Sequence, residues 1–162
     1  MPKLNHVLKA RKDNPVVKKG EPYYWWKFAF GAKQFSKNSP ARSRLTQSEF
    51  FSNLWDLEDS FNGDNYDNVA DLKDAFEEFS SALEEIRDEQ EEKRENMPES
   101  LQESPTGELL TERYDALEDW INEIDSIETD FDPDDFDPGE DSESQFCENL
   151  VEEFTALFGN VG

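Results

Sequence analysis

The chain has 162 residues, of which 35% are hydrophobic and 35% are charged, and its formal net charge at pH 7 is −24. This composition excludes a large compact core, and a single cysteine excludes an internal disulfide. The charge is unevenly spread, because residues 1–45 hold eleven basic and two acidic side chains, whereas residues 46–162 hold five basic and thirty-eight acidic ones. The two parts therefore carry net charges of +9 and −33, an asymmetry that points to charged partners rather than to a particular fold.

The sequence shows no sign of a membrane segment. No apolar run approaches the length of a membrane span, and the first residues lack the apolar stretch of a signal peptide. The single cysteine, Cys147, fits a reducing compartment. We therefore expect a cytoplasmic protein that does not enter a membrane.

Residues 1–63 are predicted to form a small β unit followed by a helix. Aromatic residues are dense over residues 22–30, which is typical of a strand, and a turn at Gly31 leads to a returning strand over residues 34–37. A lone hairpin is only marginally stable, so a third strand over residues 4–10, or the next helix, must cover it. Alternation along the strand assigns Tyr24, Trp26, Phe28 and Phe30 to the core face.

The helix of this first part is predicted over residues 46–61. Thr46 and Glu49 have the spacing of a capping box, and Leu45 and Phe50 have the spacing of a hydrophobic staple. We expect this helix to pack on the aromatic hairpin.

Residues 64–128 are predicted to form an antiparallel helical hairpin. Asn68 is placed to cap the first helix and Thr106 to cap the second, and the connection between them has room for one helical turn over residues 98–102. Each helix carries an apolar stripe, and neither stripe can be left in water. The stripes are Val69, Leu72, Phe76, Phe79, Leu83 and Ile86 in the first helix, and Leu110, Tyr114, Leu117, Ile121 and Ile124 in the second, with Trp120 beside it.

Residues 129–162 are predicted to be an acidic linker followed by a terminal amphipathic helix. Residues 130–143 combine charge repulsion with prolines and are expected to be disordered, and Ser144 is placed to cap the helix. Two interpretations of the helix's apolar side remain open. It is either a motif that docks in a partner's groove or a cover for the stripe of the helical hairpin.

Catalysis and metal binding have little support in the sequence. The only histidine, His6, and the only cysteine, Cys147, stand near opposite ends, and no glycine-rich phosphate loop is present. The carboxylate pairs lie in solvated runs, whereas general acid chemistry needs a desolvated carboxyl. The run from Asp130 to Asp134 resembles the start of an EF-hand loop, but Asp135 stands where glycine is required. We expect no enzyme, no cofactor and no dedicated metal site.

The basic N-terminal part suits nucleic acid. Alternation places Tyr23 and Trp25 on one strand face with Lys27, where rings can stack on bases while cations meet phosphates. The alternative is a set of ordinary surface lysines that keep this part docked on the acidic part. The predicted nucleic-acid contact residues are Tyr23, Trp25, Lys27, Lys33, Lys37, Arg42 and Arg44.

The acidic helices suit a partner with a basic surface. Residues 69–95 and 107–128 together have a net charge of −14, and the residues from Asp130 onward add −11. The hairpin therefore has roughly one charge per 3 Å over its ~40 Å length, against one per ~1.7 Å in duplex DNA. Solvated helix faces and mimicry of nucleic acid are both compatible with that density. The predicted partner-binding residues are Glu84, Glu85, Asp88, Glu89, Phe154, Leu157 and Phe158.

Three blocks of sequence carry a family resemblance: GEPYYWWKFAFGAKQFSK, SRLTQSEF and EEKRENMPESLQESPTGELLTER. They resemble a group of uncharacterised acidic hypothetical proteins encoded by tailed phages and related bacterial elements. The resemblance covers most of residues 1–128 and implies a context rather than an activity, namely an infected bacterium in which the protein acts on DNA metabolism or on host defence. The predicted hairpin also looks like the small three-stranded DNA-binding units that precede some phage integrases.

The sequence thus predicts an α+β protein in three parts, residues 1–63, 64–128 and 129–162. Its predicted function is that of a non-enzymatic accessory protein, in which the basic aromatic part contacts nucleic acid or a nucleic-acid-bound complex and the acidic helices bind a protein. The alternative function is a nucleic-acid mimic that inhibits a host nuclease, restriction or other defence protein. A third class, an assembly protein that self-associates through its apolar stripes, is also open, as is the oligomeric state.

Overall fold

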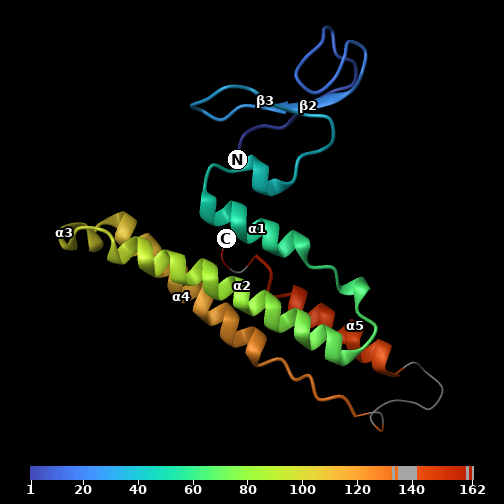
Figure 1. Cartoon of the computed structure of the whole chain (residues 1–162), viewed down its shortest axis with the longest axis vertical. Coiled ribbons are helices and arrows are strands. Elements are labelled where there is room, and N and C mark those ends of the chain that lie inside the picture. Colours follow the sequence, from blue (N-terminus) through green and yellow to red (C-terminus); the bar gives the residue numbers. More distant parts are fainter. Residues whose placement is uncertain (133, 135–141, 160, 162) are drawn as a thin grey trace. The chain divides into compact units, whose positions relative to one another are not determined.

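The computed structural model describes residues 1–132, 134, 142–159 and 161, and its architecture is α+β, with a small antiparallel sheet near the N-terminus followed by helices (Figure 1). The chain forms two compact units, Met1–Asp56 and Leu57–Gly162. The first contains eleven basic and four acidic residues, a net charge of +7, and we call it the basic unit. The second contains five basic and thirty-six acidic residues, a net charge of −31, and we call it the acidic unit. This division differs from the three parts suggested by the sequence.

The sheet of the basic unit has three strands in the order β1-β2-β3, with antiparallel neighbours. The strands are β1 (Asn5–Val7), β2 (Tyr23–Trp26) and β3 (Gln34–Ser36). The predicted third strand and the returning strand are therefore both confirmed. The register places Asn5 and Phe35 on either side of Trp25 in the central strand.

The core face predicted for β2 is only partly correct. Trp26 is 1% exposed, but Phe30 is 88% exposed. The strand ends at Trp26, so the alternation that assigned Phe30 to the core no longer applies where that residue lies. Phe30 instead precedes Gly31, whose positive φ of 146° belongs to the connection between β2 and β3.

A short 3-10 helix, η1 (Arg42–Leu45), leads into α1 (Glu49–Ser60). The predicted capping box at Thr46 is wrong, because the residue that caps α1 lies two positions later in the chain. The Thr46 hydroxyl oxygen accepts a hydrogen bond from the backbone N–H of Ser48, and the Ser48 hydroxyl accepts one from the N–H of Phe51, 3.4 Å away. Ser48 therefore takes the capping role that the spacing had given to Thr46.

The acidic unit contains the predicted helical hairpin. The hairpin comprises α2 (Val69–Glu95), the single turn α3 (Glu99–Gln102) and α4 (Pro105–Asp125), and Figure 1 shows α2 and α4 lying side by side. The residues of the two apolar stripes are buried, with exposed fractions of 0% to 8%, except for Val69 and Tyr114, which are half-buried. Trp120, predicted to flank the second stripe, is itself 1% exposed.

Of the two helix caps predicted for the hairpin, one is confirmed and the other is wrong. Asn68 caps α2 as predicted, since its side-chain oxygen accepts a hydrogen bond from the N–H of Asp71 at 2.9 Å. Thr106 does not cap α4. The helix begins earlier, with Ser104 as the cap and Pro105 in the first turn, where a missing N–H costs nothing.

The last helix, α5 (Ser142–Thr155), begins two residues before the predicted cap at Ser144. It lies beside the N-terminal half of α2 (Figure 1), and the carboxylate of Glu143 accepts a hydrogen bond from the N–H of Val69. A 3-10 turn, η2 (Gly63–Asn65), precedes α2 in the same unit. Most of the linker predicted to be disordered, residues 133 and 135–141, lies outside the described residues.

Candidate interaction surfaces

Three aromatic rings share one face of the sheet. Residues directly opposite each other in neighbouring strands point to the same face, so Trp25 and Phe35 lie together, with Tyr23 two residues along β2. The ring centroids of Tyr23 and Phe35 are 6.1 Å apart, and all three side chains are half-buried. Phe35 was missing from the predicted site, although its place in the returning strand gave the signal that could have found it.

A lysine lies directly over this aromatic face. The ammonium of Lys33 is 4.4 Å from the centroid of the Trp25 ring, a cation-π distance. Lys27 and Lys37, which directly follow β2 and β3, are exposed. The structure thus brings Tyr23, Trp25 and Lys33 together and places the other two lysines at strand ends.

The two predicted arginines lie elsewhere in the basic unit. The guanidinium of Arg44 is 5.2 Å from the ring of Trp26, which points to the opposite face of β2 from Trp25. The guanidinium of Arg42 is 5.7 Å from the ring of Trp55 in α1. Arg44 is therefore near the buried Trp26 and Arg42 near the half-buried Trp55, and neither arginine extends the Trp25 face.

The connection from β1 to β2 is an ordered loop that carries many cations. Asp13 accepts a hydrogen bond from the N–H of Lys19 at 2.8 Å, and Glu21 accepts one from the N–H of Lys18 at 2.7 Å. Both carboxylates of residues 1–45 are thereby engaged with backbone. The exposed cations of the loop are Lys9, Arg11, Lys12, Lys18 and Lys19.

The acidic surface of α2 is almost wholly open to solvent. All eleven carboxylate residues of this helix are exposed, including the predicted Glu84, Glu85, Asp88 and Glu89. An open hollow on the helix is lined by Asp74, Glu77, Glu78, Ser81, Ala82 and Glu85. Exposure in water weakens the mutual repulsion of these carboxylates but does not remove it.

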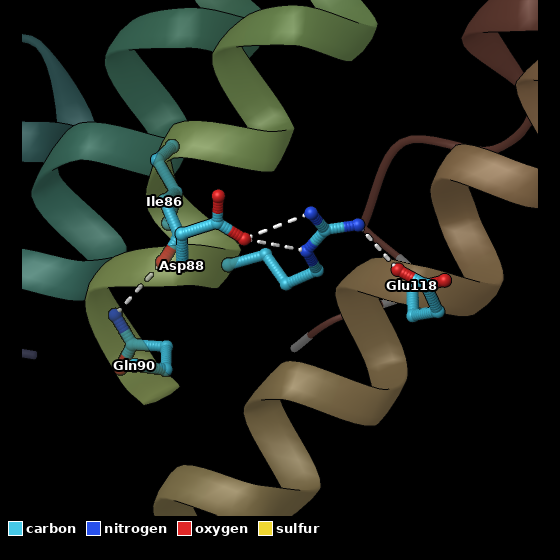
Figure 2. A network of polar contacts seen from close by, with 5 residues as sticks. Ile86, Asp88, Gln90 and Glu118 are labelled. Carbon is cyan, nitrogen blue, oxygen red and sulfur yellow. Dashed lines mark hydrogen bonds and ion pairs between the residues drawn. The ribbon is translucent and has the colours of Figure 1, made fainter. Parts of the chain in front are cut away.

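Some of the predicted acidic residues already have cationic neighbours. Figure 2 shows the dashed contacts that join Asp88 of α2 and Glu118 of α4 through Arg87, whose guanidinium is 2.8 Å from the Asp88 carboxylate. The side-chain hydrogen bond to Asp88 is the main reason that the pKa of Arg87 is raised above its ordinary value. Lys93 is 3.9 Å from the Glu89 carboxylate. Glu84 and Glu85 lie one turn before this cluster on the same helix.

The polar network of Figure 2 also contains a buried amide. Gln90 is 1% exposed, and its side-chain nitrogen donates a hydrogen bond to the backbone oxygen of Ile86 at 3.1 Å. This bond lies within α2 and satisfies one polar group of a side chain that would otherwise be costly to bury.

The terminal aromatic residues are packed inside the acidic unit. Phe154 is 0% exposed, and its ring stacks on Phe76 with centroids 4.2 Å apart. The Phe158 ring stacks on Phe79 at 5.3 Å, and Leu157 and Phe158 are half-buried. Phe154 therefore cannot serve as a docking residue in this structure. Of the two interpretations, the structure supports the cover for the hairpin stripe.

Two kinds of feature are absent from the described residues, a grouped set of metal ligands and a membrane-spanning helix. Within residues 1–132, 134, 142–159 and 161, no three His, Cys, Asp or Glu side chains are grouped for a metal ion. Part of the EF-hand-like run, including Asp135, lies outside that set. No helix in the described part of the chain combines the length and apolar character needed to cross a membrane.

Comparison of the chain with protein-family models, with curated proteins and with solved structures finds no match.

Proposed function

We propose that this chain is a non-enzymatic accessory protein that joins two partners. The basic unit contacts nucleic acid, or a complex bound to it, and α2 and α4 of the acidic unit bind a protein with a basic surface. In keeping with the resemblance of its sequence blocks, we place it among phage-type proteins that act in the cytoplasm of the infected bacterium.

One observation supports this proposal above the others. The division of charge coincides with the division into compact units, since net charges of +7 and −31 belong to separate units. Electrostatic complementarity contributes mainly to association rate and to the choice of partner. Two units of opposite sign are therefore suited to two partners of opposite charge.

Binding of the full chain to labelled DNA and RNA tests the nucleic-acid half. The Trp25→Ala, Lys27→Ala double variant should bind more weakly than the parent at about 50 mM salt, because it loses one stacking ring and one cation. If about five cations meet phosphates, log K for duplex DNA should fall against log salt with a slope of about −4 to −5. Equal binding by parent and double variant would refute this assignment.

A second function is favoured by the exposure of every carboxylate on α2. In this alternative the acidic unit imitates nucleic acid and occupies a host nuclease, restriction or other defence protein. The full chain should then block the DNA binding of that host protein, and salt should weaken the block.

Charge reversal tests whether inhibition depends on carboxylates of α2 in particular or only on the overall negative charge of the unit. Glu84→Lys with Glu85→Lys should abolish inhibition, whereas Glu99→Lys with Glu103→Lys, which changes exposed carboxylates in and after α3, should leave most of it. Recovery of partners from host lysate, with and without nuclease treatment, identifies the protein to be assayed. Inhibition that survives the first pair of changes counts against mimicry by α2.

A further inference from the structure

We infer that the nucleic acid contacted by the basic unit is single-stranded, and that its bases stack on Tyr23, Trp25 and Phe35. We call these three residues the stacking platform. The inference rests on the proposed function and names the class of nucleic acid that the unit binds.

The platform has the geometry of a base-binding surface. Its three rings lie on one face of the sheet because Trp25 is opposite Phe35 and Tyr23 is two residues away on β2. None of the three residues is fully buried, so each keeps some surface open to solvent. Aromatic rings on a sheet face bind bases without sequence preference, because every base has a flat π surface.

The spacing of the rings favours one strand over two. Two residues of a β-strand cover about 6.8 Å, whereas neighbouring bases of a duplex are about 3.4 Å apart along its axis. Bases that stack on Tyr23 and on Trp25 must therefore be separated from each other. A single strand allows this freely, but a duplex must be unpaired and unstacked first.

The position of Lys33 shows that the outer face of the Trp25 ring is accessible. Its ammonium is 4.4 Å from the ring centroid, where a stacked base would also lie. A cation-π contact at an exposed site is weak, so a base can displace the ammonium. The flexible lysine stem then allows the charge to reach the phosphate of the same nucleotide.

The charge around the platform is complementary to a nucleic-acid backbone. Lys27 and Lys37 are exposed at the strand ends, and the loop before β2 adds further exposed cations. Asp13 and Glu21, the carboxylates nearest in sequence, are held by backbone N–H groups of that loop. Phosphates that follow the platform thus meet positive charge on the same unit.

Readout of a duplex would require different side chains. A β-ribbon in the major groove identifies bases through arginine, lysine, asparagine or glutamine. The platform face instead presents rings, and the lysine over it, Lys33, is already in contact with the Trp25 ring. Its one amide, Asn5, already donates hydrogen bonds to the backbone oxygens of Lys3 and Trp25.

Fluorescence anisotropy of the full chain with three labelled probes tests the inference. The probes are oligo(dT) and oligo(rU) of about twelve nucleotides and a DNA hairpin duplex of similar length, at about 50 mM salt. We expect at least one single strand to bind about tenfold more tightly than the duplex. The two single strands distinguish DNA from RNA as the source of the bases.

Matched variants locate the contact. Trp25→Leu, which keeps an apolar side chain but removes the π surface, should weaken single-strand binding about tenfold and leave duplex binding unchanged. Trp25→Tyr should bind like the parent. Tyr24→Leu alters the opposite face, where the Tyr24 ring stacks on His6, and should also bind like the parent. Far-ultraviolet circular dichroism verifies the fold of each variant, and Phe35→Leu replaces Trp25→Leu if the latter does not fold.

The outcomes separate this inference from the proposed function. Duplex binding as tight as single-strand binding, or an unchanged affinity in folded Trp25→Leu and Phe35→Leu, overturns the platform and leaves nucleic-acid binding in place. An equal loss in Tyr24→Leu also overturns it, because both faces would then contribute. Failure of the parent to bind any probe overturns both the platform and the nucleic-acid half of the proposed function.

Discussion

Gly107, in the first turn of α4, lies against the backbone of Gln102. A Cβ atom at this position would be 2.0 Å from the Gln102 carbonyl oxygen and 2.6 Å from its carbonyl carbon. Both atoms belong to the backbone, so the contact cannot be relieved by a side-chain rotation. The absence of a single methyl group is what allows α3 to turn so closely into α4.

We therefore expect Gly107→Ala to destabilise the acidic unit. Alanine is the better helix former by about 1 kcal/mol, but overpacking against backbone costs about 1–3 kcal/mol and should outweigh that gain. Urea unfolding followed by circular dichroism measures the change. Thr106→Ala, one residue earlier and exposed, is the matched control and should change the free energy of unfolding by less than about 0.5 kcal/mol. A Gly107→Ala variant as stable as the parent would show that the turn can shift.

At the scale of whole elements, α5 is held to the rest of the acidic unit by close packing at several points. Gly63 in η2 lies so near Val151 of α5 that a Cβ added to it would be 2.3 Å from the nearest methyl carbon of that valine. Farther along α5, the Phe154 ring is enclosed by Phe61, Phe76 and Phe79. The C-terminal end is also tied to α1, because the N–H of Gly159 donates to the buried carboxylate of Glu58 at 3.0 Å.

A double-mutant cycle tests this docking of α5. Gly63→Ala alone should cost about 1–3 kcal/mol, because the added methyl group overlaps the valine side chain. Val151→Ala alone should cost less, since Val151 is only half-buried. The double variant should be more stable than the sum of the two costs predicts, by about 1 kcal/mol or more. Strictly additive costs, measured by thermal unfolding, would show that the two residues do not touch in solution.

The first residues of the helices could be predicted from the sequence only in part. The cap at Asn68 was identified correctly, but α1 and α4 each offer two hydroxyl residues two positions apart. In both cases the sequence favoured threonine, at Thr46 and Thr106, and the structure uses serine, at Ser48 and Ser104. Both residue types cap helices, so local spacing alone did not decide between them.

In the sheet and in the terminal helix, the features that the sequence did not predict depend on residues far apart in the chain. Alternation placed Tyr23 and Trp25 on one face correctly, but it cannot say where the ladder of hydrogen bonds ends, so Phe30 was misassigned. The role of Phe154 was open because its partners, Phe76 and Phe79, are more than seventy residues earlier in the chain. Periodicity predicts that an apolar side must be covered, but only the tertiary structure shows what covers it.

At the scale of the whole molecule, the charge of the acidic unit opposes its own folding. Five basic side chains offset thirty-six acidic ones, and the carboxylates of α2 are exposed along its entire length. The apolar stripes and Arg87, which joins α2 to α4, act against that repulsion, as does the packing of Phe154 against Phe61, Phe76 and Phe79. A unit of this kind should be more sensitive to ionic strength than one with balanced charge.

Added sodium chloride should therefore raise the unfolding temperature of the acidic unit. Between about 10 mM and 1 M salt the Debye length falls from about 30 Å to about 3 Å, which screens repulsion between carboxylates on neighbouring turns. Chloride is preferable to sulfate, because sulfate also strengthens apolar burial. Arg87→Met keeps an apolar stem but removes the cation from both ion pairs, and it should cost about 1 kcal/mol at low salt and less at high salt. Lys73→Met, an exposed cation on the same helix, is the control and should cost less at low salt. If the helical signal at 222 nm melts at the same or a lower temperature as salt rises, attraction rather than repulsion dominates the unit, and the surplus of carboxylates is not what limits its stability.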